Sequence, residues 1–74
     1  MRINDIVVLE NNKKYILTNK YDLDNNIYYL AYELLDNEKT DKFVFVKEVC
    51  DDGYYVILEK NEDILLKLIN QKNS

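Results

Sequence analysis

Short apolar runs separated by Asn- and Asp-rich turns are the feature that most constrains the fold of this 74-residue chain. β-Branched and aromatic side chains dominate the runs, and most runs are too short for a helix. Because side chains alternate between the two faces of a strand, each run predicts a strand with at least one apolar face. A charged loop is predicted at residues 36–42. The predicted strands are residues 5–9, 13–21, 27–34, 43–49 and 54–59.

The turn before the last predicted strand contains the only glycine of the chain, Gly53. Asp52-Gly53 is the strongest hairpin signal, because both residues of a tight hairpin turn must tolerate positive φ. A two-residue turn there predicts that Val49 faces Val56 and that Lys47 faces Leu58. The predicted inward face of this hairpin is Phe43, Phe45, Val49, Val56 and Leu58.

The tyrosines of the earlier strands are assigned to faces by the same alternation. Tyr15, Leu17 and Tyr21 are predicted to share one face of the second strand. Tyr28-Tyr29 and Tyr54-Tyr55 are adjacent pairs, so one member of each is expected to point away from the core. An outward tyrosine either covers the sheet or contacts a partner, because its side chain is rigid and amphipathic.

The last element is predicted to be a helix over residues 62–72. Asn61 is a favourable N-cap, and Glu62 and Asp63 lie in the first turn, where the helix dipole favours negative charge. An isolated helix of this length is marginal, so it must dock on the sheet. Which face of the sheet it covers is left open. The apolar stripe at helical spacing consists of Ile64, Leu65, Leu68 and Ile69.

These elements predict an α+β fold for residues 1–74 as one compact domain. The absence of proline and the single glycine argue against a flexible linker. The expected architecture is a twisted, mostly antiparallel sheet of about five strands with one C-terminal helix packed on it. An SH3-like half-barrel is one form of this arrangement.

The order of these segments resembles the YrzB-like family of small acidic bacterial proteins, known as domain of unknown function 1292. The similarity lies in D-I-V-V-L (residues 5–9), K-K-Y-I-L (13–17), N-N-I-Y-Y-L (25–30) and F-V-F-V-K-E-V (43–49), followed by a D-D-G turn and an acidic helix start. It spans roughly residues 3–70. The chain departs from the family in being less acidic and richer in Asn and Tyr. The resemblance implies a cytoplasmic bacterial domain and no assigned activity.

The negative charge of the chain is concentrated in its middle. Residues 21–63 hold twelve of the fourteen acidic residues and four lysines, a net charge of −8. Such a segment repels phosphate backbones, so nucleic acid is disfavoured as a partner, and a protein with a basic surface is expected instead. The candidate partner-binding residues are Asp22, Asp24, Tyr29, Glu38, Asp41 and Tyr55.

The residues that most enzymes and metal sites require are scarce. The chain has no histidine, one cysteine and no glycine-rich phosphate loop, so no catalytic, cofactor or metal site is predicted and the protein is not expected to be an enzyme. Residues 22–26 lack the glycine and the bidentate Glu of a calcium loop. Cys50 adjoins two aspartates, whose charges disfavour a reactive thiolate, so it is read as a structural thiol.

The expected function is protein binding by an acidic, tyrosine-bearing surface, as an adaptor or an inhibitor. A phage or mobile-element inhibitor that mimics nucleic-acid charge is one specific version. The alternatives are a small β-barrel that binds nucleic acid and a housekeeping domain of unknown role. The segment 42–46 has the aromatic alternation of RNA-binding strands, but valines and acids replace their glycines and basic residues, which favours core packing. A single cysteine and no leader or membrane-length apolar run predict a cytoplasmic location.

Overall fold

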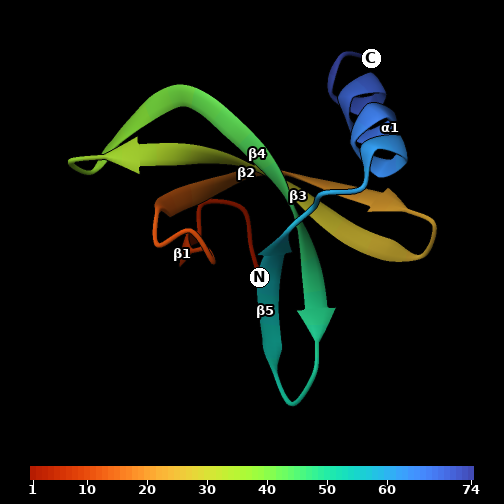
Figure 1. The fold of residues 1–74 in the computed structure, drawn as a ribbon, viewed down its shortest axis with the longest axis horizontal. Coiled ribbons are helices and arrows are strands. Elements are labelled where there is room, and N and C mark those ends of the chain that lie inside the picture. The colour runs from red at the N-terminus through yellow and green to blue at the C-terminus, as the bar shows by residue number, and fades with distance from the viewer.

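Five strands form one sheet in which each strand pairs with the next one along the chain. The computed structural model describes residues 1–74. All neighbouring strands are antiparallel. The sheet curls into a nearly closed barrel with the helix against it (Figure 1), which confirms the α+β class and the SH3-like half-barrel. The elements are β1 (Ile6–Val8), β2 (Lys14–Leu23), β3 (Asn26–Leu35), β4 (Glu38–Cys50), β5 (Tyr54–Leu58) and α1 (Glu62–Lys72).

Two long hairpins turn on Asp-Asn pairs. Asp24-Asn25 joins β2 to β3 and Asp36-Asn37 joins β3 to β4, and all four residues have positive φ between 51° and 66°. Two consecutive residues with positive φ make the tight turn that matches the twist of a hairpin, and Asp and Asn tolerate this conformation well. The predicted charged loop at residues 36–42 is therefore wrong. Only the Asp-Asn pair turns, and the charged residues after it continue as the exposed start of β4.

The third hairpin closes with a three-residue loop. Cys50 pairs with Tyr54, so residues 51–53 form the loop, and Gly53 has a φ of 128°. The predicted register is wrong by one residue: Val49 pairs with Tyr55, and Val56 pairs with Glu48. A shift of one residue moves every side chain of β5 to the other face relative to β4. Phe45 and Val56, which were predicted to share a face, therefore lie on opposite faces of the sheet.

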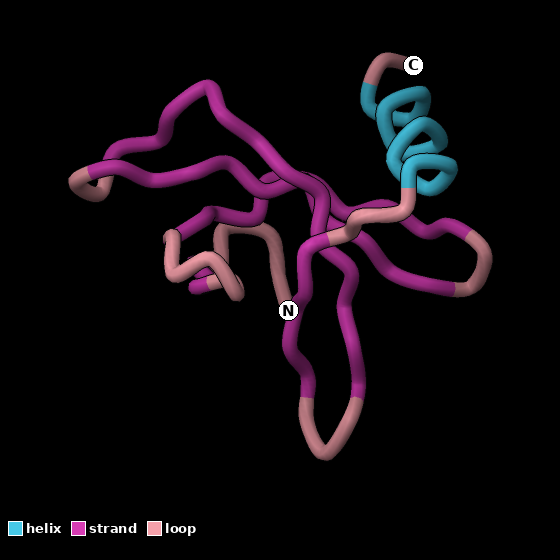
Figure 2. Tube along the Cα trace, in the orientation of Figure 1, coloured by secondary structure: helices cyan, strands magenta, loops and turns pink.

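The sheet is buried on both faces, and two apolar clusters result. The inner core fills the curled face of the sheet, and the outer core lies between its other face and α1. Figure 2 shows that α1 is the one helix and lies outside the strands of the sheet. The inner core consists of Leu9, Tyr15, Leu17, Tyr29, Ala31, Val46 and Val56. The outer core consists of Tyr28, Leu30, Phe45 and Leu68.

Both adjacent tyrosines of β3 are buried, which corrects the expectation that one of them points outward. Tyr29 belongs to the inner core and Tyr28 to the outer core. Alternation does place them on opposite faces, as predicted, but the helix covers the second face as well. The Tyr29 hydroxyl donates to the backbone oxygen of Met1 at 2.9 Å and lies 3.4 Å from Glu48 Oε1. Glu48 Oε1 also lies 3.4 Å from the amino group of Met1.

A bulge in β2 changes which side chains share a face. Leu17 pairs with Ala31 and Asn19 with Leu30, which leaves Thr18 as an extra residue. Tyr15 and Leu17 enter the inner core as predicted. Beyond the bulge the alternation reverses, so Tyr21 packs against the outer core instead of sharing their face.

The helix has the bounds and the cap that the sequence predicts. The Asn61 side-chain oxygen accepts from the backbone N–H of Ile64 at 3.1 Å. Leu68 is 0% exposed at the centre of the outer core, and Ile64 and Leu65 pack beside it. Ile69 was predicted to be buried against the sheet as well, but 38% of it is exposed. The helix therefore covers only part of the outer face.

On the free edge of β5, one backbone N–H group is hydrogen-bonded by a side chain from the other end of the sheet. Both carboxylate oxygens of Glu10, just after β1, lie 3.1 and 3.3 Å from the backbone nitrogen of Leu58, which donates to them. An unpaired edge strand offers its N–H and C=O groups to other chains. Glu10 satisfies one of these groups and brings the ends of β1 and β5 together without a hydrogen-bonded ladder.

The buried tyrosines make the free energy of unfolding depend on pH in the alkaline range. Burial raises the pKa of Tyr29, and the Glu48 carboxylate beside it raises the pKa further. Burial likewise raises the pKa values of Tyr28 and Tyr21, with smaller contributions from Glu59 and Asp24 at Tyr28 and from Tyr32 at Tyr21. The folded state therefore holds these protons more tightly than the unfolded chain, in which tyrosine ionises near a pH of about 10.

We expect the free energy of unfolding to fall as pH rises through about 10, because the unfolded chain then loses tyrosine protons that the folded state keeps. The decline should continue until the folded phenols ionise. Urea midpoints measured from about pH 8 to about pH 11 test this. Tyr29→Phe should show a shallower decline than the wild type, and Tyr54→Phe, at an exposed position, should follow the wild type. Identical declines in all three proteins would contradict the role of Tyr29.

A candidate binding groove between β4 and the helix

The acidic residues singled out by the sequence do not form one surface. Asp22 and Asp24 lie at the β2–β3 turn, and Glu38 and Asp41 lie at the start of β4, beyond the β3–β4 turn. These turns stand at opposite ends of β3, whose ten residues span about 30 Å at ~3.3 Å per residue. Figure 1 shows the two turns at opposite sides of the molecule. All four side chains are exposed, but no partner patch of ordinary size unites them.

The two tyrosines of the predicted site differ in exposure. Tyr55 is exposed on β5, as expected. Tyr29 is 1% exposed, so the prediction that it contacts a partner is wrong. Its hydroxyl is used inside the protein by Met1 and Glu48. One of the exposed acids is also engaged, because Asp24 Oδ2 lies 3.5 Å from Lys67 Nζ on α1.

A groove of about 330 Å³ opens where α1 leaves the sheet uncovered. The middle of β4 forms one side, α1 forms the other, and the connection from β5 to α1 lies at one end. Alternation places Phe43 and Phe45 on the same face of β4, and the spacing of four residues places Leu65 and Ile69 on one side of the helix. The lining residues are Phe43, Val44, Phe45, Leu58, Glu59, Lys60, Leu65 and Ile69.

A row of four aromatic rings crosses the sheet at the groove. Ring centroids are 6.1 Å apart for Tyr21 and Phe45, 5.9 Å for Phe45 and Phe43, and 5.7 Å for Phe43 and Tyr32. The first two contacts are edge-to-face, a favoured geometry for aromatic pairs. Phe45 is buried beneath the helix, whereas Phe43 is 41% exposed. Phe43 thus packs between two neighbouring rings at the groove while much of its own surface stays accessible.

Three lysines lie at or near the groove although the protein as a whole is acidic. Lys72 Nζ lies 5.1 Å from the centroid of the Phe43 ring, and Lys39 Nζ lies 4.4 Å from that of Tyr32. Both distances suit a cation–π contact. Lys60 lines the groove directly, next to Glu59. The Glu59 carboxylate accepts from the backbone N–H groups of Lys60 and Asn61 at 3.0 and 2.9 Å, so this acid is already engaged.

Phe43 was predicted from the sequence to lie in the core with Phe45, so the groove was not foreseen. One signal for it was present in the helix. Five of the six residues from Ile64 to Ile69 are apolar, more than one face of a short helix can bury on a sheet. Leu66 is 62% exposed on the far side of the helix.

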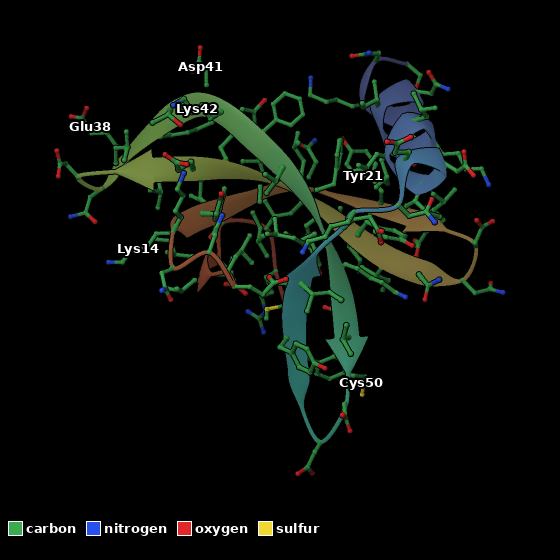
Figure 3. All side chains as sticks on the ribbon, viewed as in Figure 1. Lys14, Tyr21, Glu38, Asp41, Lys42 and Cys50 are labelled. Carbon is green, nitrogen blue, oxygen red and sulfur yellow. The ribbon has the colours of Figure 1, made fainter.

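Other kinds of site have no support in the geometry. Within residues 1–74, no group of three or more His, Cys, Asp or Glu side chains is arranged to hold a metal ion. Cys50 is exposed at the end of β4, where Figure 3 shows it near the tip of the β4–β5 hairpin. No helix is long and apolar enough to cross a membrane.

No protein-family model, curated protein or solved structure matches the chain. The resemblance to the YrzB-like family therefore rests on the quoted sequence segments alone.

Proposed function

We propose that this protein is a small protein-binding module that holds apolar side chains of a partner in the groove between β4 and α1. The observation that carries the proposal is the exposure of Phe43 and Ile69 on the two sides of one apolar groove. Apolar surface that is concave and framed by polar residues is typical of binding sites. A rigid aromatic side chain such as Phe43 is also a favoured anchor in interfaces.

Such a module acts by occupying its partner, as an adaptor or as an inhibitor, and the single cysteine favours the cytoplasm as the compartment. The predicted acidic surface supports this role less well than the groove does. The acids at the β2–β3 and β3–β4 turns lie too far apart to contact one small epitope, whereas the groove is one continuous surface. We therefore assign partner contact to the groove and leave the acidic turns to solubility.

The alternative of a nucleic-acid-binding barrel has one observation in its favour, the exposed Phe43 ring beneath Lys72. Proteins that bind single strands stack successive bases on several exposed rings. Here Phe45, the next ring in the row, is 3% exposed. Phe43 is the one ring of this row that is exposed and not only partly exposed, and together with the net charge of −4 this favours a protein partner.

Photo-crosslinking at defined positions of α1 tests the proposal. A benzophenone side chain is placed at Ile69, in the groove, or at Lys67, which is exposed on the opposite side of the helix and points toward Asp24 at the β2–β3 turn. We expect irradiated cells of the source organism to give a discrete protein adduct from the position 69 variant and none of the same mass from the position 67 variant. Identical adduct patterns from both positions, or no adduct from position 69, would contradict the proposal.

A further inference from the structure

We propose that the segment bound in the groove carries an apolar anchor flanked on one side by acidic residues, and that these acids lie at the Phe43 end of the groove. The inference rests on the proposed function and goes beyond it by naming the partner's chemistry. It follows from three features of the groove: its apolar lining, its unpaired lysines and the uneven distribution of charge along it.

The apolar lining sets the anchor. Six of the eight lining residues are hydrophobic, and the volume of about 330 Å³ is at the lower end of the range for pockets that enclose small organic groups. A groove of this size accepts an anchor of large aliphatic or aromatic side chains and leaves the rest of the partner segment outside. The flanking residues of that segment must then meet the rim.

The rim at the Phe43 end carries positive charge. One stripe of α1 runs along the groove, because Ile69 and Lys72 follow Leu65 by four and seven residues. Lys72 ends that stripe beside Phe43. Lys39 extends the positive region across the neighbouring Tyr32 ring. The three ion pairs of the protein join Met1 to Glu48, Lys13 to Glu33 and Lys67 to Asp24. Lys39 and Lys72 therefore have no carboxylate partner of their own.

The acids nearest this end do not cancel its charge. Asp41 is followed directly by Lys42, so this pair contributes no net charge, and Figure 3 shows Asp41 at the crest of β4, projecting away from the sheet. Glu38 precedes Lys39 in β4, so the two side chains point to opposite faces of the strand, and Glu38 lies farther out, at the tip of the β3–β4 hairpin. Lys39 and Lys72 are thus the charges left to meet a ligand.

The other end of the groove has a different character. Lys60 is accompanied there by Glu59 and by the two acids of the first helical turn, Glu62 and Asp63. The charge at the rim therefore differs between the two ends of the groove: it is basic at the Phe43 end and mixed at the start of α1. Complementary charge sets orientation and partner choice in interfaces. The charge difference between the two ends of the groove therefore selects a segment with its acids on one side of the anchor only.

Selection from a random library of displayed peptides, followed by fluorescence anisotropy on synthetic copies, tests the inference with defined probes. Each selected peptide is made in its original form and with every Asp and Glu changed to the amide. The protein is used as wild type, as Lys39→Glu/Lys72→Glu, and as the matched control Lys14→Glu. Lys14 is an exposed lysine of β2 that Figure 3 shows on the side away from the helix. Ile69→Gln reports whether a peptide uses the groove.

We expect the selected peptides to combine apolar anchors with Asp or Glu on one consistent side. Loss of the acids should weaken binding to the wild type about 3- to 10-fold, as expected for two partly exposed ion pairs. Lys39→Glu/Lys72→Glu should weaken binding at least as much and should bind the amide form better than the acidic form. Lys14→Glu should bind both forms as the wild type does.

The possible failures separate the partner's chemistry from the function itself. If Ile69→Gln weakens binding but acidic and amide peptides bind equally, or if basic flanks are selected, the groove binds peptides and the charge inference is wrong. If no peptide depends on Ile69, the proposed function fails. If oligothymidylate displaces the peptides from the wild type but does not bind Lys39→Glu/Lys72→Glu, the groove would be assigned to nucleic acid. A dimer in sedimentation that Ile69→Gln dissociates would assign it to a second copy of the chain. Either result overturns the inference.

Discussion

Leu68→Ala is expected to lower the free energy of unfolding by about 2–5 kcal/mol, the usual cost of removing a buried leucine side chain. Leu68 is 0% exposed and is the only helix residue fully buried in the outer core, where it packs with Tyr28, Leu30 and Phe45. The substitution would leave a cavity between the helix and the sheet. A domain of this size has a stability of about 3–5 kcal/mol from its core, so most of it would be lost.

Leu66→Ala is the matched control, because it makes the same change two residues away on the exposed side of the same helix. Urea unfolding followed by far-ultraviolet circular dichroism should show an unchanged midpoint for Leu66→Ala and a strongly lowered one for Leu68→Ala. Sucrose stabilises compact states and would bring a largely unfolded variant into the measurable range. Equal midpoints for the two variants would show that the helix does not depend on the sheet.

Tyr29→Ala is expected to cost about 3–5 kcal/mol and to leave the chain largely unfolded at room temperature. Tyr29 lies in the inner core, and its hydroxyl binds the backbone oxygen of Met1 and approaches Glu48. Tyr29→Phe keeps the ring and removes only the hydroxyl, so its cost should be about 0.5–1.5 kcal/mol. The two substitutions therefore separate the packing of the ring from its hydrogen bonds.

The same pair of variants distinguishes a core residue from a surface residue. Tyr55→Ala, at an exposed position on β5, is the control and should change the free energy of unfolding far less than Tyr29→Ala. Thermal and urea unfolding at neutral pH provide the measurement. A Tyr29→Ala protein as stable as Tyr55→Ala would place Tyr29 at the surface and restore it as a candidate for partner contact.

The features that were predicted correctly depend on local properties of the chain. Strand positions follow from runs of β-branched and aromatic residues, and the hairpin at Gly53 follows from the conformational freedom of glycine. The helix bounds follow from Asn61, whose side chain caps an N–H three residues away. The α+β class and half-barrel follow from these elements because each strand pairs with its neighbour along the chain. Each of these inferences needs only residues close together in the sequence.

Apart from the charged loop at residues 36–42, most of which is the start of β4, the features that were predicted wrongly concern which face a side chain occupies and what covers it. The bulge at Thr18 reverses the alternation of β2 and separates Tyr21 from Leu17. The loop at residues 51–53 is one residue longer than predicted and moves Val56 to the face opposite Phe45. Alternation cannot report an extra residue, because pairing with the partner strand decides where that residue goes.

The groove depends on the tertiary structure in the same way. The sequence by itself determined that the chain forms strands, tight turns and one capped helix, because these follow from local backbone preferences and hydrogen bonds. Only the tertiary packing decided which apolar side chains are buried. The curled sheet encloses Tyr29, and α1 covers Tyr28 on the other face but leaves Phe43 and Ile69 partly exposed. The physical reason is that burial depends on what covers a residue. Here the covering helix begins 19 residues after Phe43 in the chain, and the extent of its cover decides which apolar side chains of the sheet stay exposed.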